Sequence, residues 1–114
     1  MGKTAFHTYC LRVKPQYREE YLENHMHVWP EVEAALKRAG VASYRIWITP
    51  DNLLIAVVEF QEGCDMQDVA RESAQVPRCQ EWEAYMANMQ RPCEYAKSGE
   101  WWCELPAAYE LIGE

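Results

Sequence analysis

The sequence has no apolar stretch long enough to span a bilayer, and no apolar segment follows a basic start at its N-terminus. It also lacks basic clusters, because 11 Lys and Arg stand against 18 Asp and Glu, a formal net charge of -7. Nucleic-acid binders and proteins of anionic membrane surfaces need such clusters, so the composition argues against both classes. We therefore expect a soluble, cytoplasmic protein with a neutral or cationic ligand.

Paired cysteines are missing as well. The five cysteines are odd in number and scattered, and none forms the C-x-x-C pair typical of zinc or redox motifs. We expect reduced thiols, with Cys10 as a small buried residue of a strand. A metal site built on His7, His25 and His27 would have no carboxylate or thiolate at a recognised ligand spacing, so no metal is predicted.

Length and pattern together predict a single domain over residues 1–114. The run from Thr4 to Val13 alternates like a strand, and Pro15 suits the first turn of a helical segment over residues 16–39. Pro30 interrupts that helix, because it lacks a backbone donor and pushes the preceding residue out of the helical region. Gly40 is a natural end for it.

The second half of the chain repeats this alternation of strand and helix. Residues 41–49 alternate, and Pro50-Asp51-Asn52 makes a turn into the apolar run 53–60, so a hairpin is predicted. A helical region follows from about Asp65 and is broken near Pro77. A last strand is predicted over residues 100–111.

The resulting order is β-α-β-β-α-β, a ferredoxin-like α+β fold in which two helices pack on one face of a four-stranded antiparallel sheet. Both faces of the strand that begins at Leu53 are apolar, so the side without helices needs a cover. We expect a homodimer that packs sheet to sheet.

The segment from Tyr21 to Glu31 places ionisable and aromatic groups where an apolar helix face would simply continue. Tyr21 and His25 are four residues apart, so their side chains stand on the same helix face. An unperturbed histidine pKa of about 6.5 suits proton transfer at neutral pH. His27 is turned to another face and is expected either at the surface or as a supporting residue behind the site.

At this point the chain resembles the L-rhamnose mutarotase family over nearly its whole length. The resemblance rests on Glu20-Tyr21 with His25, Trp29-Pro30-Glu31, Gly40 leading to Tyr44, Asn52-Leu53-Leu54, Cys79-Gln80-x-Trp82 with Tyr85-Met86, and Glu104-Leu105. It implies a dimeric α/β barrel and a cofactor-free enzyme that interconverts the α and β anomers of a 6-deoxy sugar. It further points to His25 as the catalytic proton donor, with Tyr21, Tyr44 and Trp82 lining the sugar site.

The chemistry of mutarotation agrees with these residue types. Ring opening needs a proton on the ring oxygen and removal of the anomeric hydroxyl proton, which His25 and Tyr21 could share. A flat indole such as Trp82 covers the apolar face and methyl group of a deoxy sugar. Tyr44 offers a hydroxyl, and the further polar candidates are Glu83, Asn24, Glu31 and His27.

Departures from the family pattern keep alternatives open. The family often has two adjacent tryptophans where this chain has Trp82-Glu83, so Glu83 could accept hydrogen bonds from a differently placed hydroxyl. L-fucose is therefore an alternative to L-rhamnose. Small dimeric monooxygenases and haem-handling proteins share the expected fold, and a non-catalytic sugar-binding protein could use the same aromatic residues.

Overall fold

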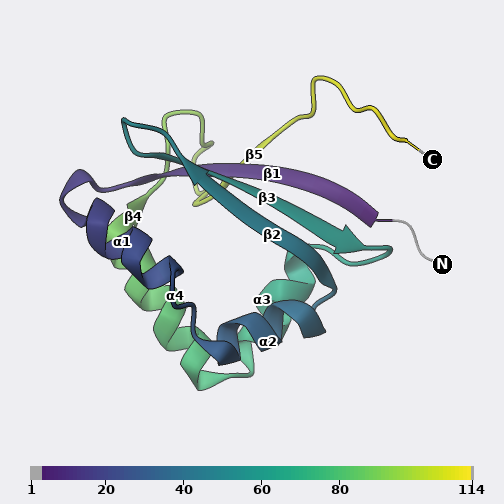
Figure 1. The fold of residues 1–114 in the computed structure, drawn as a ribbon, viewed down its shortest axis with the longest axis horizontal. Coiled ribbons are helices and arrows are strands. Elements are labelled where there is room, and N and C mark those ends of the chain that lie inside the picture. The colour runs from purple at the N-terminus through teal and green to yellow at the C-terminus, as the bar shows by residue number, and fades with distance from the viewer. Residues whose placement is uncertain (1–3, 114) are drawn as a thin grey trace.

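The computed structural model describes residues 4–113 and contains five strands and four α-helices (Figure 1). The strands are β1 (Thr4–Val13), β2 (Val41–Ile48), β3 (Leu53–Gln61), β4 (Gln90–Arg91) and β5 (Cys103–Leu105). The helices are α1 (Arg18–His25), α2 (Pro30–Arg38), α3 (Met66–Ala74) and α4 (Pro77–Met89), and a 3-10 turn, η1 (Pro15–Tyr17), precedes α1.

The strands form one antiparallel sheet with β1 at its centre. The order is β2-β3-β1-β4, and β5 also pairs with β1, beside Thr8 to Cys10. The predicted hairpin is present: Asn52 adopts a positive φ of 71° in the turn between β2 and β3. The predicted ferredoxin-like α+β fold is confirmed.

All four α-helices lie on the same side of the curled sheet (Figure 1). Pro30 and Pro77 each occupy the first turn of a helix, where a missing backbone N–H costs nothing. Asp65 caps α3 with a reciprocal pair of side-chain and backbone hydrogen bonds that includes Asp68. Within residues 4–113, none of the helices is both long and apolar enough to cross a membrane.

The predicted breaks in both helical regions are present, and the first lies over residues 26–29, ahead of Pro30. Two details differ from the sequence-based expectation. The last strand spans only Cys103–Leu105 of the predicted 100–111, because Pro106 has no N–H to continue a ladder. The two-residue strand β4 was not predicted, since so short a segment has no alternation to detect.

The two faces of the sheet differ in their cover. Leu11, Leu54 and Val58 are at most 1% exposed and face the helices. On the opposite face, Phe6 and Trp47 are 51% and 55% exposed. The expected asymmetry, one packed face and one apolar face without helices, is therefore confirmed.

Candidate active site

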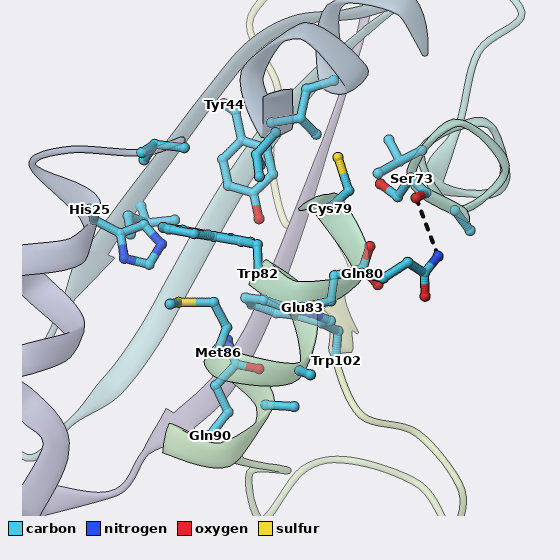
Figure 2. A pocket seen from close by; sticks show the side chains of 18 of the residues that line it. His25, Tyr44, Ser73, Cys79, Gln80, Trp82, Glu83, Met86, Gln90 and Trp102 are labelled. Atoms are coloured by element: carbon cyan, nitrogen blue, oxygen red, sulfur yellow. Dashed lines mark hydrogen bonds between the residues drawn. The ribbon is translucent and has the colours of Figure 1, made fainter. Parts of the chain in front are cut away.

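A cavity of about 850 Å³ lies between the sheet and the helix layer. Side chains from α1, α2, α3, α4 and β2 line it, together with Trp101 and Trp102 from the segment before β5 (Figure 2). The lining is mostly apolar with a few polar groups, which is typical of a site for a small molecule. A single chain therefore already provides room for a ligand.

All five predicted site residues line this one cavity: Tyr21, His25, Tyr44, Trp82 and Glu83. They come from α1, β2 and α4, which are far apart in sequence. The other polar candidates, Asn24, His27 and Glu31, are not among the cavity-lining residues. His27 is at the surface, one of the two positions expected for it, with its Nε2 atom 3.9 Å from a Glu23 carboxylate oxygen.

His25 is held in one tautomer by its own helix. Its Nδ1 atom lies 2.9 Å from the carbonyl oxygen of Tyr21, and a carbonyl can only accept, so Nδ1 carries the proton. The Nε2 atom of the neutral ring then has a free lone pair. Burial lowers the pKa of His25 below 6.5, although the hydrogen bond to Tyr21 opposes this shift. At neutral pH the residue is therefore ready to accept a proton.

The phenol of Tyr21 is oriented by Gln90, whose own amide is fixed by Trp101. The indole Nε1–H of Trp101 donates to Oε1 of Gln90 at 2.9 Å, which turns the amide nitrogen of Gln90 toward Tyr21. That nitrogen donates to the Tyr21 hydroxyl oxygen at 2.8 Å. The O–H of Tyr21 is thereby left to donate to a ligand.

Burial also decides what Tyr21 can do with that proton. Desolvation raises the pKa of Tyr21 to about 12, although the Gln90 hydrogen bond opposes this shift. The phenol therefore keeps its proton at neutral pH and acts as a hydrogen-bond donor.

Trp82 packs against the histidine and a second tryptophan. Its ring centre lies 5.5 Å from that of His25 and 5.1 Å from that of Trp29, both in edge-to-face geometry. The guanidinium carbon of Arg78 lies 3.7 Å above the Trp29 ring, a cation–π contact. Tyr21 stacks on His25 from its own helix, with ring centres 4.6 Å apart. The imidazole is thus confined between aromatic rings.

The sheet and the outer turn of α4 supply the remaining polar groups. Tyr44 extends from β2 toward Trp82 (Figure 2). Burial of its hydroxyl raises the pKa of Tyr44 well above the usual value of 10, so it too stays protonated. Glu83 lines the cavity with Gln80, whose amide donates to the Ser73 carbonyl at 3.3 Å. The cavity therefore combines two hydroxyl donors with a carboxylate acceptor.

Sequence reasoning missed Gln90, Trp101 and Trp102. Gln90 stands just after the last turn of α4, and the two tryptophans lie in a segment without regular structure until β5. No periodic pattern marks such positions. The adjacent Trp101-Trp102 pair in a short acidic segment was the available signal.

The lowered pKa of His25 predicts a pH dependence of stability. Because the unfolded state binds the proton more readily, the free energy of unfolding should fall as pH drops below about 6.5 toward the lower folded-state value. NMR titration of the His25 ring protons should give a midpoint below 6.5. In the His25→Gln variant this component of the pH dependence should vanish. The assignment would be contradicted if the free energy of unfolding of the variant fell with pH between 7 and 5 as steeply as that of the wild type. A wild-type NMR midpoint at or above 6.5 would contradict it as well.

The curled antiparallel sheet and the helices on one face define a ferredoxin-like protein, and its cavity for a small ligand contains a histidine able to accept a proton. The sequence pattern of the L-rhamnose mutarotase family matches residues 7–111. The chain belongs to this family and is an isomerase of the sugar mutarotase type.

Individual relatives agree with this assignment. The L-rhamnose mutarotase of Klebsiella pneumoniae is 39% identical over 79 residues, 68% of this chain and 72% of the relative. That of Shigella flexneri serotype 5b is 37% identical over 82 residues, 71% of this chain and 75% of the relative. The crystal structure of L-rhamnose mutarotase from Formosa agariphila superposes with a TM-score of 0.70 at 19% identity, covering 95% and 99% of the two chains.

A different class shares the fold alone. A putative antibiotic biosynthesis monooxygenase from Nitrosomonas europaea superposes with a TM-score of 0.57 at 12% identity, covering 92% of this chain and 88% of the other. This similarity extends to the arrangement of sheet and helices and carries no activity across.

Proposed function

We propose that this chain interconverts the α and β anomers of L-rhamnose, with His25 as the proton-transfer group. The observation that carries the proposal is the neutral His25 imidazole, whose Nδ1 is engaged by the Tyr21 carbonyl and which lines the cavity together with Tyr21 and Trp82. The relatives are L-rhamnose mutarotases, which suggests the sugar, and the apolar lining suits its methyl group.

His25 begins the reaction as a base. Its Nε2 lone pair takes the proton of the anomeric hydroxyl while the bond from C1 to the ring oxygen breaks and C1 becomes an aldehyde. The imidazolium then gives this proton to the former ring oxygen, which was bonded to the same carbon and so still lies within reach of one side chain. Rotation about the C1–C2 bond presents the other face of the aldehyde, and the same steps in reverse close the ring.

Tyr21 stabilises the charge that develops on the ring oxygen. Its O–H is free to donate because Gln90 already donates to the phenol oxygen. With a pKa of about 12 it need not lose the proton, so one proton carrier suffices. Trp82 covers an apolar face of the sugar, and Tyr44 and Glu83 hydrogen-bond to its hydroxyls.

Saturation-transfer NMR of anomer exchange tests the proposal directly. Purified protein should raise the exchange rate of L-rhamnose above the buffer rate and above that of L-fucose at equal concentration. Faster exchange of L-fucose would reassign the sugar and implicate Glu83. No acceleration of either sugar by folded protein would overturn mutarotation of these sugars and favour a binding protein.

We infer that two copies of the chain form a homodimer through the sheet face opposite the helices. The inference is supported by the half-exposed Trp47 and Phe6 beside the apolar side chains of β3. A monomer that left this face in water would expose a contiguous apolar patch, and burying it stabilises the pair.

Sedimentation velocity checks this interface. Trp47→Asp should shift the protein from dimer to monomer, because it places a charge within the proposed contact. Met26→Asp is the matched control, since Met26 is 72% exposed between α1 and α2, in the helix layer. A Trp47→Asp variant that sediments as wild type would place the interface elsewhere.

We place the enzyme in the cytoplasm, as the sequence analysis predicts. All five cysteines are free thiols, although three lie close together. Free thiols persist in a reducing compartment, which supports this localisation. Cell fractionation with an antibody to the native protein tests it, and recovery outside the cytoplasmic fraction would contradict it.

A further inference from the structure

Three cysteines that are distant in sequence meet on the sheet face away from the sugar cavity. Cys10 lies on β1 opposite Cys103 on β5, and Cys93 follows β4. All three sulfurs lie within 4.8 Å of one another, and those of Cys10 and Cys93 are 3.5 Å apart. Their side chains are at most 7% exposed. Cys64 and Cys79 lie outside this trithiol cluster.

We propose that Cys10, Cys93 and Cys103 form a binding site for one trivalent, thiophilic centre of the arsenous acid type, held by three sulfur atoms. The spacing fits such a site. With bonds of about 2.3 Å from the centre to each sulfur, the sulfurs of a three- or four-coordinate thiolate site lie roughly 3.5 to 4 Å apart. The observed cluster needs only small side-chain rotations to reach this spacing.

The number of ligands argues against zinc. Among residues 4–113 no fourth His, Cys, Asp or Glu atom joins the cluster. Structural zinc sites in proteins are almost always closed by four protein ligands. Leu53, Ile55, Ala96 and Leu105 pack around the sulfurs instead, so water is a poor substitute for the missing ligand.

The charge of the product decides which soft ion fits. Three thiolates give a net charge of -2 with a monovalent ion, -1 with a divalent ion and zero with a trivalent one. An uncompensated charge is costly in apolar surroundings. Within residues 4–113, no hydrogen bond or ion pair joins a cationic side chain to the three sulfurs. The guanidinium of Arg12, on the same strand as Cys10, pairs instead with Glu94 and Asp51. A neutral product suits these surroundings best.

The thiols are protonated, which suits a reaction in which three neutral thiols replace the three hydroxyl groups of arsenous acid. Burial raises the pKa of Cys10 to about 12, and it raises that of Cys103 as well. In the binding step three S–H bonds and three arsenic–oxygen bonds break, three arsenic–sulfur bonds form, and three water molecules leave. No atom changes its oxidation state, and no net proton is released. The reaction therefore requires no buried thiolate to persist.

Binding would fix the segment between two of the ligands. This segment, residues 93–103, contains Trp101, which orients Gln90, and Trp102, which lines the cavity. Its only regular structure is the start of β5. A centre bonded to Cys93 and Cys103 closes this loop, and a ligand that binds the folded state in preference to the unfolded state stabilises it increasingly as the free ligand concentration rises above the dissociation constant.

Arsenite titration of the reduced full-length protein, in the absence of oxygen, tests the proposal. After desalting, mass spectrometry should find one arsenic per chain, with a mass gain of one arsenic atom less three hydrogens. A thiol assay in denaturant, run before the arsenic is released, should count two thiols where the free protein has five. The melting temperature should rise with arsenite concentration.

Single variants separate the trithiol site from other cysteines. Cys93→Ala and Cys103→Ala each leave two sulfurs and should bind at least about 10²-fold more weakly, because the third bond forms intramolecularly. Cys64→Ala and Cys79→Ala are the matched controls and should bind as wild type. Cys93 lies outside regular structure, so its variant tests the site even if substitution on β1 impairs folding.

Two outcomes would overturn the proposal: no arsenic retained by the reduced protein, or equal affinity in the Cys93→Ala variant. Preferential binding of Zn(II) over arsenite would also overturn it. The outcome is independent of mutarotation, because none of the three sulfurs lines the sugar cavity.

Discussion

Replacing His25 with alanine should slow anomer exchange of the preferred sugar by about 10²–10⁴-fold, the usual contribution of a positioned acid–base group. The variant keeps the apolar lining and the Tyr21 hydroxyl, so the sugar should still bind. Saturation-transfer NMR gives the exchange rate, and a ligand-observed NMR titration gives the binding constant. Loss of exchange with retained binding would identify His25 as a proton carrier.

Two controls make this result specific. His27→Ala changes an exposed histidine two residues away and should leave the exchange rate within about twofold of wild type, because surface substitutions have small effects. Added imidazole should partly restore exchange in His25→Ala, since the truncated side chain leaves space beside Trp82. A His25→Ala variant with more than half of the wild-type rate would show that another group carries the proton.

The fold was predictable because its signals are local. Pro30, Pro77 and Gly40 mark helix starts and ends through backbone restrictions that hold in any context. Alternation over residues 41–49 likewise marked a strand with two different faces. The last strand was predicted to be too long because Tyr109 and Leu111 are residue types typical of strands. Their side chains are 78% and 82% exposed, and neither residue pairs with another strand among residues 4–113.

The site was predictable only in part, because only some of its contacts join residues that are close in sequence. Tyr21 and His25 share a helix face, so their spacing already brings them together. The contact between Gln90 and Tyr21 spans 69 residues, and that between Cys10 and Cys93 spans 83. Such pairs form only when the sheet and the helix layer assemble, and no local pattern records them.

The assembled structure also explains why one fold serves unrelated chemistry. The monooxygenase-like neighbour shares the sheet and the helices, whereas the proton-transfer geometry that we propose depends on the side chains of His25, Tyr21 and Gln90. Acid–base ring opening needs only a base that is neutral at working pH and a donor near the ring oxygen. The cavity residues supply both.

Truncating Trp82 should have the largest effect on stability. Trp82 is 7% exposed and packs on His25 and Trp29 within the main core, so Trp82→Ala should lower the free energy of unfolding by about 3–5 kcal/mol. Since small domains are stable by only about 5–15 kcal/mol, this is a large fraction of the total. Urea denaturation at fixed protein concentration measures the change.

A second aromatic variant separates packing from sugar binding. Trp82→Phe keeps a ring against His25 and should lose markedly less stability than Trp82→Ala, while the smaller ring covers less of the sugar and weakens its binding. Tyr95→Ala, at a side chain that is 62% exposed, should change stability by no more than about 0.5 kcal/mol. If Trp82→Ala unfolds at the wild-type urea concentration, the edge-to-face contacts contribute nothing net, and Trp82 serves the ligand alone. If both Trp82 variants lose the same amount of stability, a phenyl ring does not replace the packing of the indole. The contribution to stability would then come from the pyrrole part of the indole, which both substitutions remove.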